Sequence, residues 1–390
     1  MQNYDKEIAL KQERINKLLS GVVPDIEPVV RADNPLHYRN KVHAAIGISK
    51  GRIVAGTYEP GSHRIIDGGG SELENEKAVA VISDIVKIAS KYHMSVYNEK
   101  TGQGLLRRVL IRTGDATGQM LVVVVVADHV FPGKKNFVKT LINMHPEITS
   151  VVVNINRRTD SMILGDRSEI CYGKGYIVDE LLGKRFSISP ESFYQVNRKQ
   201  AEKLYSIAIA LAGLKPDSKL LDAYCGTGTI GICMSPYCGQ VLGVEINPKA
   251  VSDAQHNIRN NKASNVKVIK ADATAYMNEN ASRSKYDVIV LDPPREGTTP
   301  DFIKACGRIA PERIVYISCN PDTLARDLRL FEKEDYKAVK AVPVDMFSGT
   351  EHIEVVSLLQ RVSNIRERTI TLDVEMEDYH RIVNGDDHNK

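Results

Sequence analysis

The chain has 390 residues, of which 42% are hydrophobic and 26% are charged, which is typical of a soluble globular protein. This composition excludes a disordered, fibrous or collagen-like chain, and at about 150 residues per domain the length predicts two or three domains. The longest apolar run, residues 120–127, is far shorter than the roughly 20 residues of a membrane span. The charged N-terminus lacks the apolar core of a signal peptide. We therefore expect a cytoplasmic protein that does not associate with membranes.

The overall charge is nearly balanced, because 52 lysines and arginines face 49 acidic residues, a net charge of +3. The distribution is less even, since residues 31–64 contain six basic and two acidic side chains, a local +4. Such a stretch is able to follow a phosphate backbone, and equally able to form an ordinary solvated face. Arg39, Lys41 and Arg52 are the candidate phosphate contacts within it.

The six cysteines at 171, 225, 233, 238, 306 and 319 contain no CxxC pair, and none precedes residue 171. A disulfide framework is not expected in a cytoplasmic protein of this size. No histidine lies near the cysteines at 233 and 238 to complete a zinc site, so we expect no bound metal.

The first half of the chain predicts an α+β domain. An amphipathic helix over 4–19 precedes glycine-rich strands in 38–66, which read as antiparallel, and a helix over 76–91. Further predicted elements are a hairpin of 105–113 and 120–128, a basic helix over 134–143, a strand over 150–156 and two strands ending near 188. We therefore expect residues 1–29 to form an N-terminal helix and residues 30–185 an α+β domain with an antiparallel sheet, which is the candidate RNA-binding domain.

From residue 199 onward, strands alternate with helices at intervals of about 25–30 residues, a pattern that indicates βαβ units and a parallel sheet. Two consecutive strands, in 336–347 and 352–360, end the series. Seven strands with an antiparallel pair at the end is the layout of class I (Rossmann-like) methyltransferases, and we assign residues 186–361 to such a domain. The charged tail, 362–390, is either an ordered appendage or a frayed terminus.

The segment LLDAYCGTGTIGI, residues 220–232, predicts a strand, a glycine turn and a helix. Gly226 and Gly228 allow a ligand to approach the backbone closely, as in dinucleotide-binding enzymes and in methyltransferases. Glu245 ends the next strand, where it is able to bind ribose hydroxyls, although it is also placed to cap the helix that follows. Asp272 ends the third strand, near the expected adenine. This third acid favours S-adenosylmethionine over NAD; Tyr224 either contacts the methionine moiety or belongs to the core.

Three later motifs follow strands of the predicted sheet. LDPPREG places Asp292 at the ligand-binding edge, and YISCNP places Cys319 at the same edge. In GTEHIEVV, His352 and Glu354 are expected to share one strand face. Taken alone, a cysteine at a strand end is usually a small buried residue and a strand glutamate is usually solvated. DPPR differs from the Asn-Pro-Pro-aromatic motif of amino methyltransferases.

Together, SFYQVN (192–197), DAYCGTGTIG, LDPPREG, SCNP and DMFSGTEHIEVV resemble, in order and spacing, the RNA uracil-C5 methyltransferases of 23S ribosomal RNA and transfer RNA. The likeness is dense over 186–360 and thinner over 36–66. It implies S-adenosylmethionine as cofactor, Cys319 as the nucleophile that adds to uracil C6, and Glu354 as the base that removes the C5 proton. It also implies that Gln195 lies beside the cofactor and the base, and that Asp292 lies between cofactor and uracil.

The sequence departs from this family in three respects, one of which is the charged C-terminal tail, which has no counterpart in the family pattern. Many members carry an N-terminal β-barrel and four cysteines that hold an iron–sulfur cluster, and we expect neither here. We expect a monomer that methylates a uridine of structured RNA, 23S ribosomal RNA rather than the transfer-RNA T-loop. Two rival hypotheses are a class I methyltransferase acting on an exocyclic amine, and an RNA-binding module with an inactive methyltransferase domain. Cys225, in the glycine loop, is the other candidate thiol and is expected to line the cofactor pocket.

Overall fold

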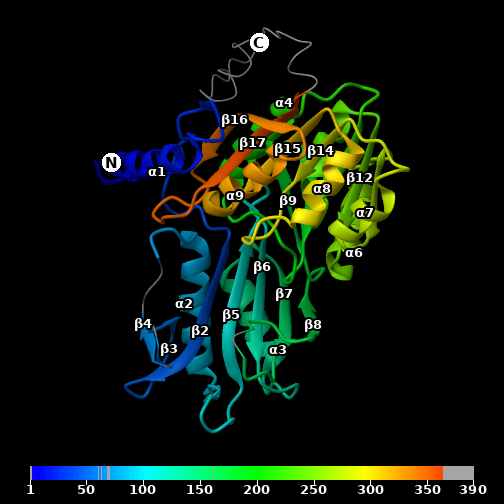
Figure 1. The fold of residues 1–390 in the computed structure, drawn as a ribbon. Coiled ribbons are helices and arrows are strands. Elements are labelled where there is room, and N and C mark those ends of the chain that lie inside the picture. The colour runs from blue at the N-terminus through cyan, green and yellow to red at the C-terminus, as the bar shows by residue number, and fades with distance from the viewer. Residues whose placement is uncertain (1, 60, 63, 68–70, 161, 363–390) are drawn as a thin grey trace, which may run out of the picture. The chain divides into compact units, whose positions relative to one another are not determined.

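The computed structural model describes residues 2–362, apart from 60, 63, 68–70 and 161 (Figure 1). It divides into two compact units. The first unit contains Met1–Pro35, Leu181–Lys184 and the chain from Lys199 onward; the second contains Leu36–Glu180 and Arg185–Arg198. These limits differ from the boundaries predicted after residues 29 and 185, because residues 1–35 belong to the first unit and residues 185–198 to the second. Residues 363–390, nearly all of the charged tail, lie outside the described residues.

The first unit is built on an eight-stranded sheet. In spatial order its strands are β1 (Asp25–Ile26), β16 (Tyr336–Val344), β17 (Glu354–Arg361), β15 (Arg313–Ser318), β14 (Val288–Leu291), β11 (Lys219–Ala223), β12 (Gln240–Glu245) and β13 (Val266–Lys270). Strand β17 is antiparallel to both of its neighbours, and the other pairs are parallel. Seven strands therefore have the class I methyltransferase arrangement predicted from the sequence, and β1 adds an edge strand that was not predicted.

Helices cover both faces of this sheet. They are α1 (Gln2–Leu19), α4 (Arg198–Ala212), α5 (Thr229–Met234), the 3-10 helix Ser235–Tyr237, α6 (Pro248–Asn260), α7 (Ala273–Asn280), α8 (Pro300–Ile309) and α9 (Pro321–Glu332). One hydrophobic cluster joins the sheet to helices α1, α7, α8 and α9, and Ile269 of β13 packs against it. The preceding residue of the same strand, Val268, belongs to a separate cluster with α6. Because neighbouring strand residues point to opposite faces, these two clusters lie on opposite sides of the sheet.

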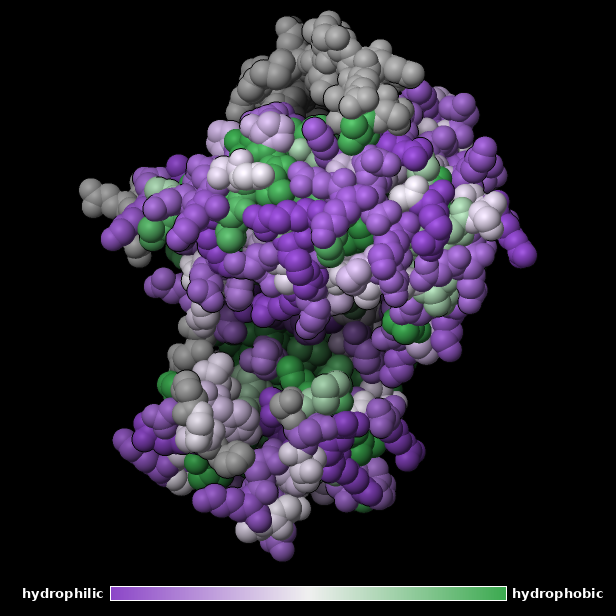
Figure 2. Space-filling view, in the orientation of Figure 1, coloured by the Kyte–Doolittle hydropathy of each residue, from purple (hydrophilic) through white to green (hydrophobic). Residues whose placement is uncertain are grey.

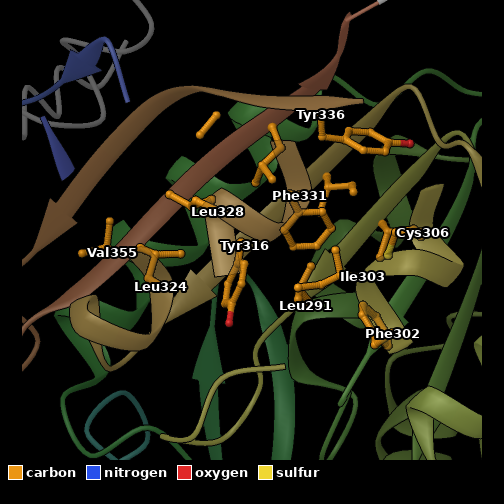
Figure 3. Close-up of a cluster of buried hydrophobic side chains, with 14 of the residues drawn as sticks. Leu291, Phe302, Ile303, Cys306, Tyr316, Leu324, Leu328, Phe331, Tyr336 and Val355 are labelled. Atoms are coloured by element: carbon orange, nitrogen blue, oxygen red, sulfur yellow. The ribbon is translucent and has the colours of Figure 1, made fainter. Parts of the chain in front are cut away.

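The larger cluster contains the buried aromatic rings of Phe302, Tyr316, Phe331 and Tyr336 among aliphatic side chains (Figure 3). The ring of Phe331 lies 6.5 Å from that of Tyr316 and 6.2 Å from that of Tyr336, edge-on to both. Both phenols are buried with a partner, since Tyr316 donates to Asp327 and Tyr336 to the carbonyl of Pro311, each over 2.7 Å. Burial of each such ring contributes about 1.5–3 kcal/mol to folding. This cluster fixes β15 and α9, between which Cys319 lies.

The second unit contains a seven-stranded sheet with two helices. In spatial order its strands are β4 (Ile65–Asp67), β3 (Arg52–Tyr58), β2 (Lys41–Ser49), β5 (Leu106–Thr113), β6 (Met120–Val126), β7 (Ile148–Ile155) and β8 (Arg167–Tyr172). Helices α2 (Glu76–Lys91) and α3 (Lys134–Met144) pack into one core with this sheet. Strands β9 (Ile177–Leu181) and β10 (Lys184–Ile188) form a separate pair.

The prediction of a wholly antiparallel sheet in the second unit was wrong at one pair of strands. Strands β6 and β7 are parallel. Helix α3 lies in the segment between them. It returns the chain to the end of the sheet at which β6 begins, so that β7 runs in the same direction as β6.

Helix α1 is anchored by a buried ion pair. Its Lys11 is 4% exposed and donates to Asp345, which is fully buried, over 2.6 Å. Tyr4 and Ser348 donate to the other oxygen of Asp345, over 2.7 and 2.6 Å. Ile15 and Leu19 of the same helix are buried in the large cluster. Figure 1 shows α1 beside the loop that joins β16 to β17.

No helix in the described part of the chain is long and apolar enough to cross a membrane, and the face in Figure 2 is mostly hydrophilic.

Replacing Lys11 by methionine should lower the free energy of unfolding by about 3–5 kcal/mol, because Asp345 would stay buried without its counter-charge. Urea denaturation followed by circular dichroism measures this loss. The control is Lys17→Met on the same helix, at an exposed position, which should cost less than about 1 kcal/mol. Equal effects of the two substitutions would show that the ion pair does not anchor α1.

Candidate active site

Three predicted site residues meet at one edge of the first unit's sheet. Asp292 follows the last residue of β14, Cys319 follows the last residue of β15, and Glu354 is the first residue of β17. In the register of these strands, Ser318 is paired with Val355. Cys319 and Glu354 are therefore brought together because β17 runs in the opposite direction to β15.

The site buries its acidic groups. Glu354 is 4% exposed, and its Oε2 has no hydrogen-bond partner among the described residues. Burial and the neighbouring Asp292 carboxylate raise the pKa of Glu354, and the Arg295 guanidinium opposes this rise. Burial also raises the pKa of Asp292. Both carboxyl groups thus keep their protons to a higher pH than exposed ones do, and Glu354 has an oxygen available for a bound molecule.

The Cys319 thiol is half-buried and responds to the same charges. Burial, then Glu354 and Asp292, raise its pKa to about 11, whereas Arg295 lowers it. A thiol becomes a good nucleophile only as the thiolate. The positive charge of Arg295 therefore favours the reactive form of Cys319, and the two carboxylates oppose it unless they are protonated.

Helix α9 holds the loop that carries Asp292 and Arg295. The backbone carbonyl of Arg295 accepts hydrogen bonds from Asn320 Nδ2 and Thr323 Oγ1, over 3.1 and 3.2 Å. Asp327 accepts from the backbone N–H of Thr298 over 2.9 Å. Gly297 has φ +77°, and a Cβ there would lie 2.4 Å from Asp327 Oδ2, so the close approach requires glycine.

His352 lies outside the strand that contains Glu354, contrary to the prediction. It was expected to share a strand face with Glu354, but β17 begins only at Glu354. His352 instead lies in the preceding loop, where its backbone N–H donates to Thr350 Oγ1 over 3.2 Å. The tight turn at 347–350, closed by a bond from Thr350 Oγ1 to the Phe347 carbonyl, delays the start of the strand.

A pocket of about 880 Å³ opens beside Cys319. Its walls come from helix α1, from the segment 319–321 and from the loop 349–353, with Arg295 also contributing. All these residues belong to the first unit. The predicted nucleophile thus faces a space large enough for a ligand.

The glycine loop after β11 provides a second, adjoining set of polar groups. Gly231 donates its backbone N–H to Asp222 Oδ2 over 2.8 Å, while the buried Asp222 Oδ1 has no partner among the described residues. Glu245 accepts from the backbone N–H groups of Gly226 and Asn247, over 3.0 and 2.7 Å. Gly226 has φ +53°, and a Cβ there would meet nothing within 4 Å, so the space in front of the loop is open.

These features fit S-adenosylmethionine. A carboxylate oxygen has two lone pairs, so Glu245 is able to accept ribose hydroxyls as well as the backbone amides. Helix α6 is capped by Asn247, whose Oδ1 accepts from the backbone of Lys249 and Ala250, so Glu245 is not its cap. Asp272 is exposed and caps α7 by accepting from Ala275 over 2.8 Å.

The remaining predicted cofactor residues occupy different surroundings. Gly228 directly precedes α5. Tyr224 contacts the core, since its ring lies 5.6 Å from that of Phe302 and its hydroxyl is 2.9 Å from Thr298 Oγ1. Gln195 is buried in the second unit, where its backbone carbonyl accepts from Asn40 Nδ2 over 2.9 Å.

The candidate RNA contacts also belong to the second unit, but they do not form one cluster. Lys41 begins β2 and Arg39 lies two residues before it, and burial together with Arg112 lowers the pKa of Lys41 to about 8. Arg52 begins β3 opposite Ser49, at the other end of β2. At about 3.3 Å per residue this nine-residue strand separates the two groups by about 26 Å. Arg31, from the same basic run, instead pairs with Asp5 in the first unit.

The two candidate thiols differ in accessibility. Cys225 is buried, and its Sγ packs so closely against Gly243 that a Cβ added to this glycine would lie 2.8 Å from the sulfur. Burial strongly raises the pKa of the Cys225 thiol. Cys319 lines the pocket. The geometry therefore favours Cys319 as the nucleophile. Within the described residues, no cluster of three or more His, Cys, Asp or Glu side chains is arranged to hold a metal ion.

Sequence reasoning missed two buried charges that position the site. Lys11 follows Ile8 by three residues and precedes Ile15 by four, so it falls on the apolar stripe of its helix. Asp327 lies between Leu324 and Leu328 on the buried face of α9. A charge on an apolar stripe signals a buried partner, and this signal was available in the sequence.

Because burial raises the pKa of Glu354, the free energy of unfolding should depend on pH through this group. A carboxyl group whose pKa is higher in the folded than in the unfolded state destabilises the fold as pH rises above its ordinary value of 4.5. Glu354→Gln removes this term. The variant should therefore gain about 1 kcal/mol or more relative to wild type between about pH 5 and about pH 8.

Urea denaturation at the two pH values measures the difference. Glu351→Gln, an exposed position three residues earlier, is the matched control and should show no such change. A Glu354→Gln variant that followed the pH dependence of the wild type would contradict the burial of an ionisable group at this site.

Comparison with known proteins gives the family. Residues 155–362 match the family model described as tRNA (uracil-5-)-methyltransferase. An RNA methyltransferase of Clostridium tetani is 38% identical over 361 residues, covering 92% of this chain and 78% of the relative. An RNA methyltransferase of Lactiplantibacillus plantarum is 38% identical over 366 residues, covering 92% and 79%.

A solved structure agrees with both. The tRNA (uracil-54, C5)-methyltransferase of Pyrococcus abyssi, in complex with S-adenosyl-L-homocysteine, superposes with a TM-score of 0.77 at 27% identity, covering 91% of this chain and 83% of that one. The expected fold class and cofactor are thereby confirmed. The chain belongs to the RNA uracil-5-methyltransferase family and is an S-adenosylmethionine-dependent enzyme.

Proposed function

We propose that this protein methylates C5 of a uridine in structured RNA through a covalent adduct between Cys319 and C6 of the base. One observation carries the proposal: a half-buried thiol lines a pocket and is next to a buried glutamate with an unpaired oxygen. Uracil C5 is a poor nucleophile, and a thiol together with a base is the pair of groups that its methylation requires.

The reaction begins at Cys319. Its thiolate sulfur forms a bond to C6, the C5–C6 double bond opens, and its electron pair becomes available at C5. S-adenosylmethionine, when bound, supplies the electrophilic methyl group that C5 takes up. The target uridine must leave its base stack for both faces of the ring to be reached.

Glu354 completes the reaction. Its carboxylate takes the proton from C5, the C5–C6 double bond re-forms, and the C6–sulfur bond breaks to release the thiolate. A base is most effective when its pKa lies near the working pH, and burial moves the pKa of Glu354 upward in this direction. Asp292, whose negative charge raises the pKa of Glu354, is assigned to the position between cofactor and uracil.

The remaining roles are assigned from the family. Glu245 binds the ribose, Asp272 the adenine, and the loop at Gly226 and Gly228 lies against the cofactor. Gln195 is assigned to the cofactor and the substrate. We assign Arg39, Lys41 and Arg52 to RNA phosphates. The 26 Å spacing of these three basic residues suits an extended backbone rather than a single phosphate.

We propose 23S ribosomal RNA as the substrate, and the likeness to the Pyrococcus abyssi enzyme supports the transfer-RNA T-loop as a second candidate. Methyl transfer to each RNA, purified from a strain that lacks the gene, separates them. Mapping of 5-methyluridine in both RNAs then identifies the nucleotide. We infer that the enzyme acts as a monomer, which light scattering of the active protein tests.

The two catalytic residues should fail in different ways. Cys319→Ala should be inactive and form no covalent complex with RNA. Glu354→Gln should accumulate a denaturation-resistant protein–RNA complex that contains the transferred methyl group, because the C5 proton stays and elimination stalls. Loss of a general base costs about 10²–10⁴-fold, so slow turnover is expected. Gel electrophoresis under denaturing conditions, with RNA and methyl labelled separately, measures the complex.

An RNA that contains 5-fluorouridine should trap the wild type in the same way, because fluorine does not leave as a cation. Cys225→Ala is the control and should still be trapped. Full activity of Cys319→Ala would support the rival hypothesis, methylation of an exocyclic amine. Methyl transfer by neither wild type nor variants would support an inactive domain.

Cofactor binding should depend on Glu245. Loss of an acceptor for buried ribose hydroxyls costs about 1–3 kcal/mol, so Glu245→Ala should weaken S-adenosylmethionine binding about 5- to 150-fold. Titration calorimetry measures the affinity. Glu279→Ala, exposed on α7, is the control. Wild-type affinity in Glu245→Ala would remove the ribose assignment.

A further inference from the structure

The pocket beside Cys319 has one wall that the assigned reaction does not use. This wall is the face of helix α1 that carries Lys6, Leu10 and Arg14. At about 880 Å³ the pocket is near the upper end of the range of about 300–1,000 Å³ for ligand sites, and is larger than one uracil ring needs. The extra space lies next to the atom proposed to bond the base.

The lining of the pocket is predominantly positive. Four cationic side chains, Lys6, Lys11, Arg14 and Arg295, face two acidic ones, Glu7 and Glu351. Lys11 is paired with Glu7 and Asp345, and Arg14 with Asp322 over 2.8 Å.

Neither of the two remaining cations forms a salt bridge with a described carboxylate, although the charge of Arg295 acts on Glu354 and Cys319 from a longer distance. In the described part of the chain neither Lys6 nor Arg295 forms an ion pair, and both side chains are exposed. They come from segments far apart in the sequence, yet they line the same pocket as Cys319. Two unpaired positive charges beside a single candidate nucleophile indicate an anionic ligand that reaches past the reacting base.

The helix is held firmly enough to act as a wall. Besides the Lys11–Asp345 pair, Glu7 accepts from the backbone N–H of Gly349 over 2.9 Å, and Arg14 donates to the carbonyl of Glu351 over 3.2 Å. These contacts fix α1 to the loop that leads into Glu354. Lys6 is therefore presented at a defined place relative to the catalytic edge.

We propose that α1 belongs to the RNA-binding surface, and that Lys6 and Arg295 bind the backbone phosphates that flank the target uridine. This inference rests on the proposed function, since it takes RNA as the polymer whose base reaches Cys319. Lys and Arg contacts to phosphate position a nucleic acid without reading its sequence. Leu10, which is 56% exposed on the same wall, provides an apolar surface for the adjacent sugar or base.

Fluorescence anisotropy with a labelled RNA hairpin that carries a loop uridine tests the wall. Lys6→Ala and Arg295→Ala should each weaken binding about 3- to 10-fold near 0.1 M salt. Each loss of a phosphate contact should also reduce the slope of log affinity against log salt by about 0.7–0.9. Affinity for S-adenosylmethionine should stay unchanged in both variants.

Two control variants give opposite expectations. Lys17→Ala removes a positive charge from α1 outside the pocket lining and should leave both affinity and salt slope near the wild-type values. Glu351→Gln removes a negative charge from the pocket and should tighten RNA binding. A Lys6→Ala variant that binds like Lys17→Ala at every salt concentration would overturn the proposal.

The trapping experiment separates this inference from the proposed function. Suppose that 5-fluorouridine RNA traps the wild type, and that Lys6→Ala and Arg295→Ala bind RNA as the wild type does. The assignment of Lys6 and Arg295 to the flanking phosphates is then wrong, and the catalytic assignment stands. If the wild type is not trapped, but both variants lose RNA affinity and salt dependence, the wall stands and the covalent mechanism is wrong.

Discussion

The reversed direction of β17 is the constraint on which the site depends. In a parallel sheet only the carboxyl ends of strands meet at the ligand-binding edge. Because β17 is antiparallel to β15, its amino end reaches this edge and places Glu354 beside Cys319. The proposed nucleophile, just after the end of one strand, and the proposed base, at the start of its neighbour in the sheet, are thus brought together by backbone pairing of β15 with β17.

Burial then gives these groups their chemistry. A carboxylate is expensive to bury without a partner, and the site contains two, Asp292 and Glu354, with Arg295 as the nearby cation. One oxygen of Asp222 and one of Glu354 are shielded from water and have no hydrogen-bond partner among the described residues. These unsatisfied groups are a stability cost that a bound cofactor and base would relieve.

Local pattern was sufficient for the elements that carry the chemistry. The alternation of strands and helices predicted the parallel sheet of the first unit with its antiparallel pair at the end, and helix 76–91 was predicted with the bounds that the structure has. Features set by distant contacts were not predicted. The parallel pairing of β6 with β7 depends on where α3 packs. The pocket wall at Lys6 depends on an ion pair, Lys11–Asp345, that spans most of the sequence.

That span has a consequence for biosynthesis. Lys11 and Asp345 are separated by 334 positions, and the second unit lies between them in the chain. At about 5–20 residues per second, a ribosome takes roughly 20–70 s to make the intervening polypeptide. Lys11 therefore leaves the ribosome long before its counter-charge, and the second unit is synthesised between the two. For that whole interval its apolar stripe, which includes Ile15 and Leu19, lacks the members of its hydrophobic cluster that belong to β16 and β17.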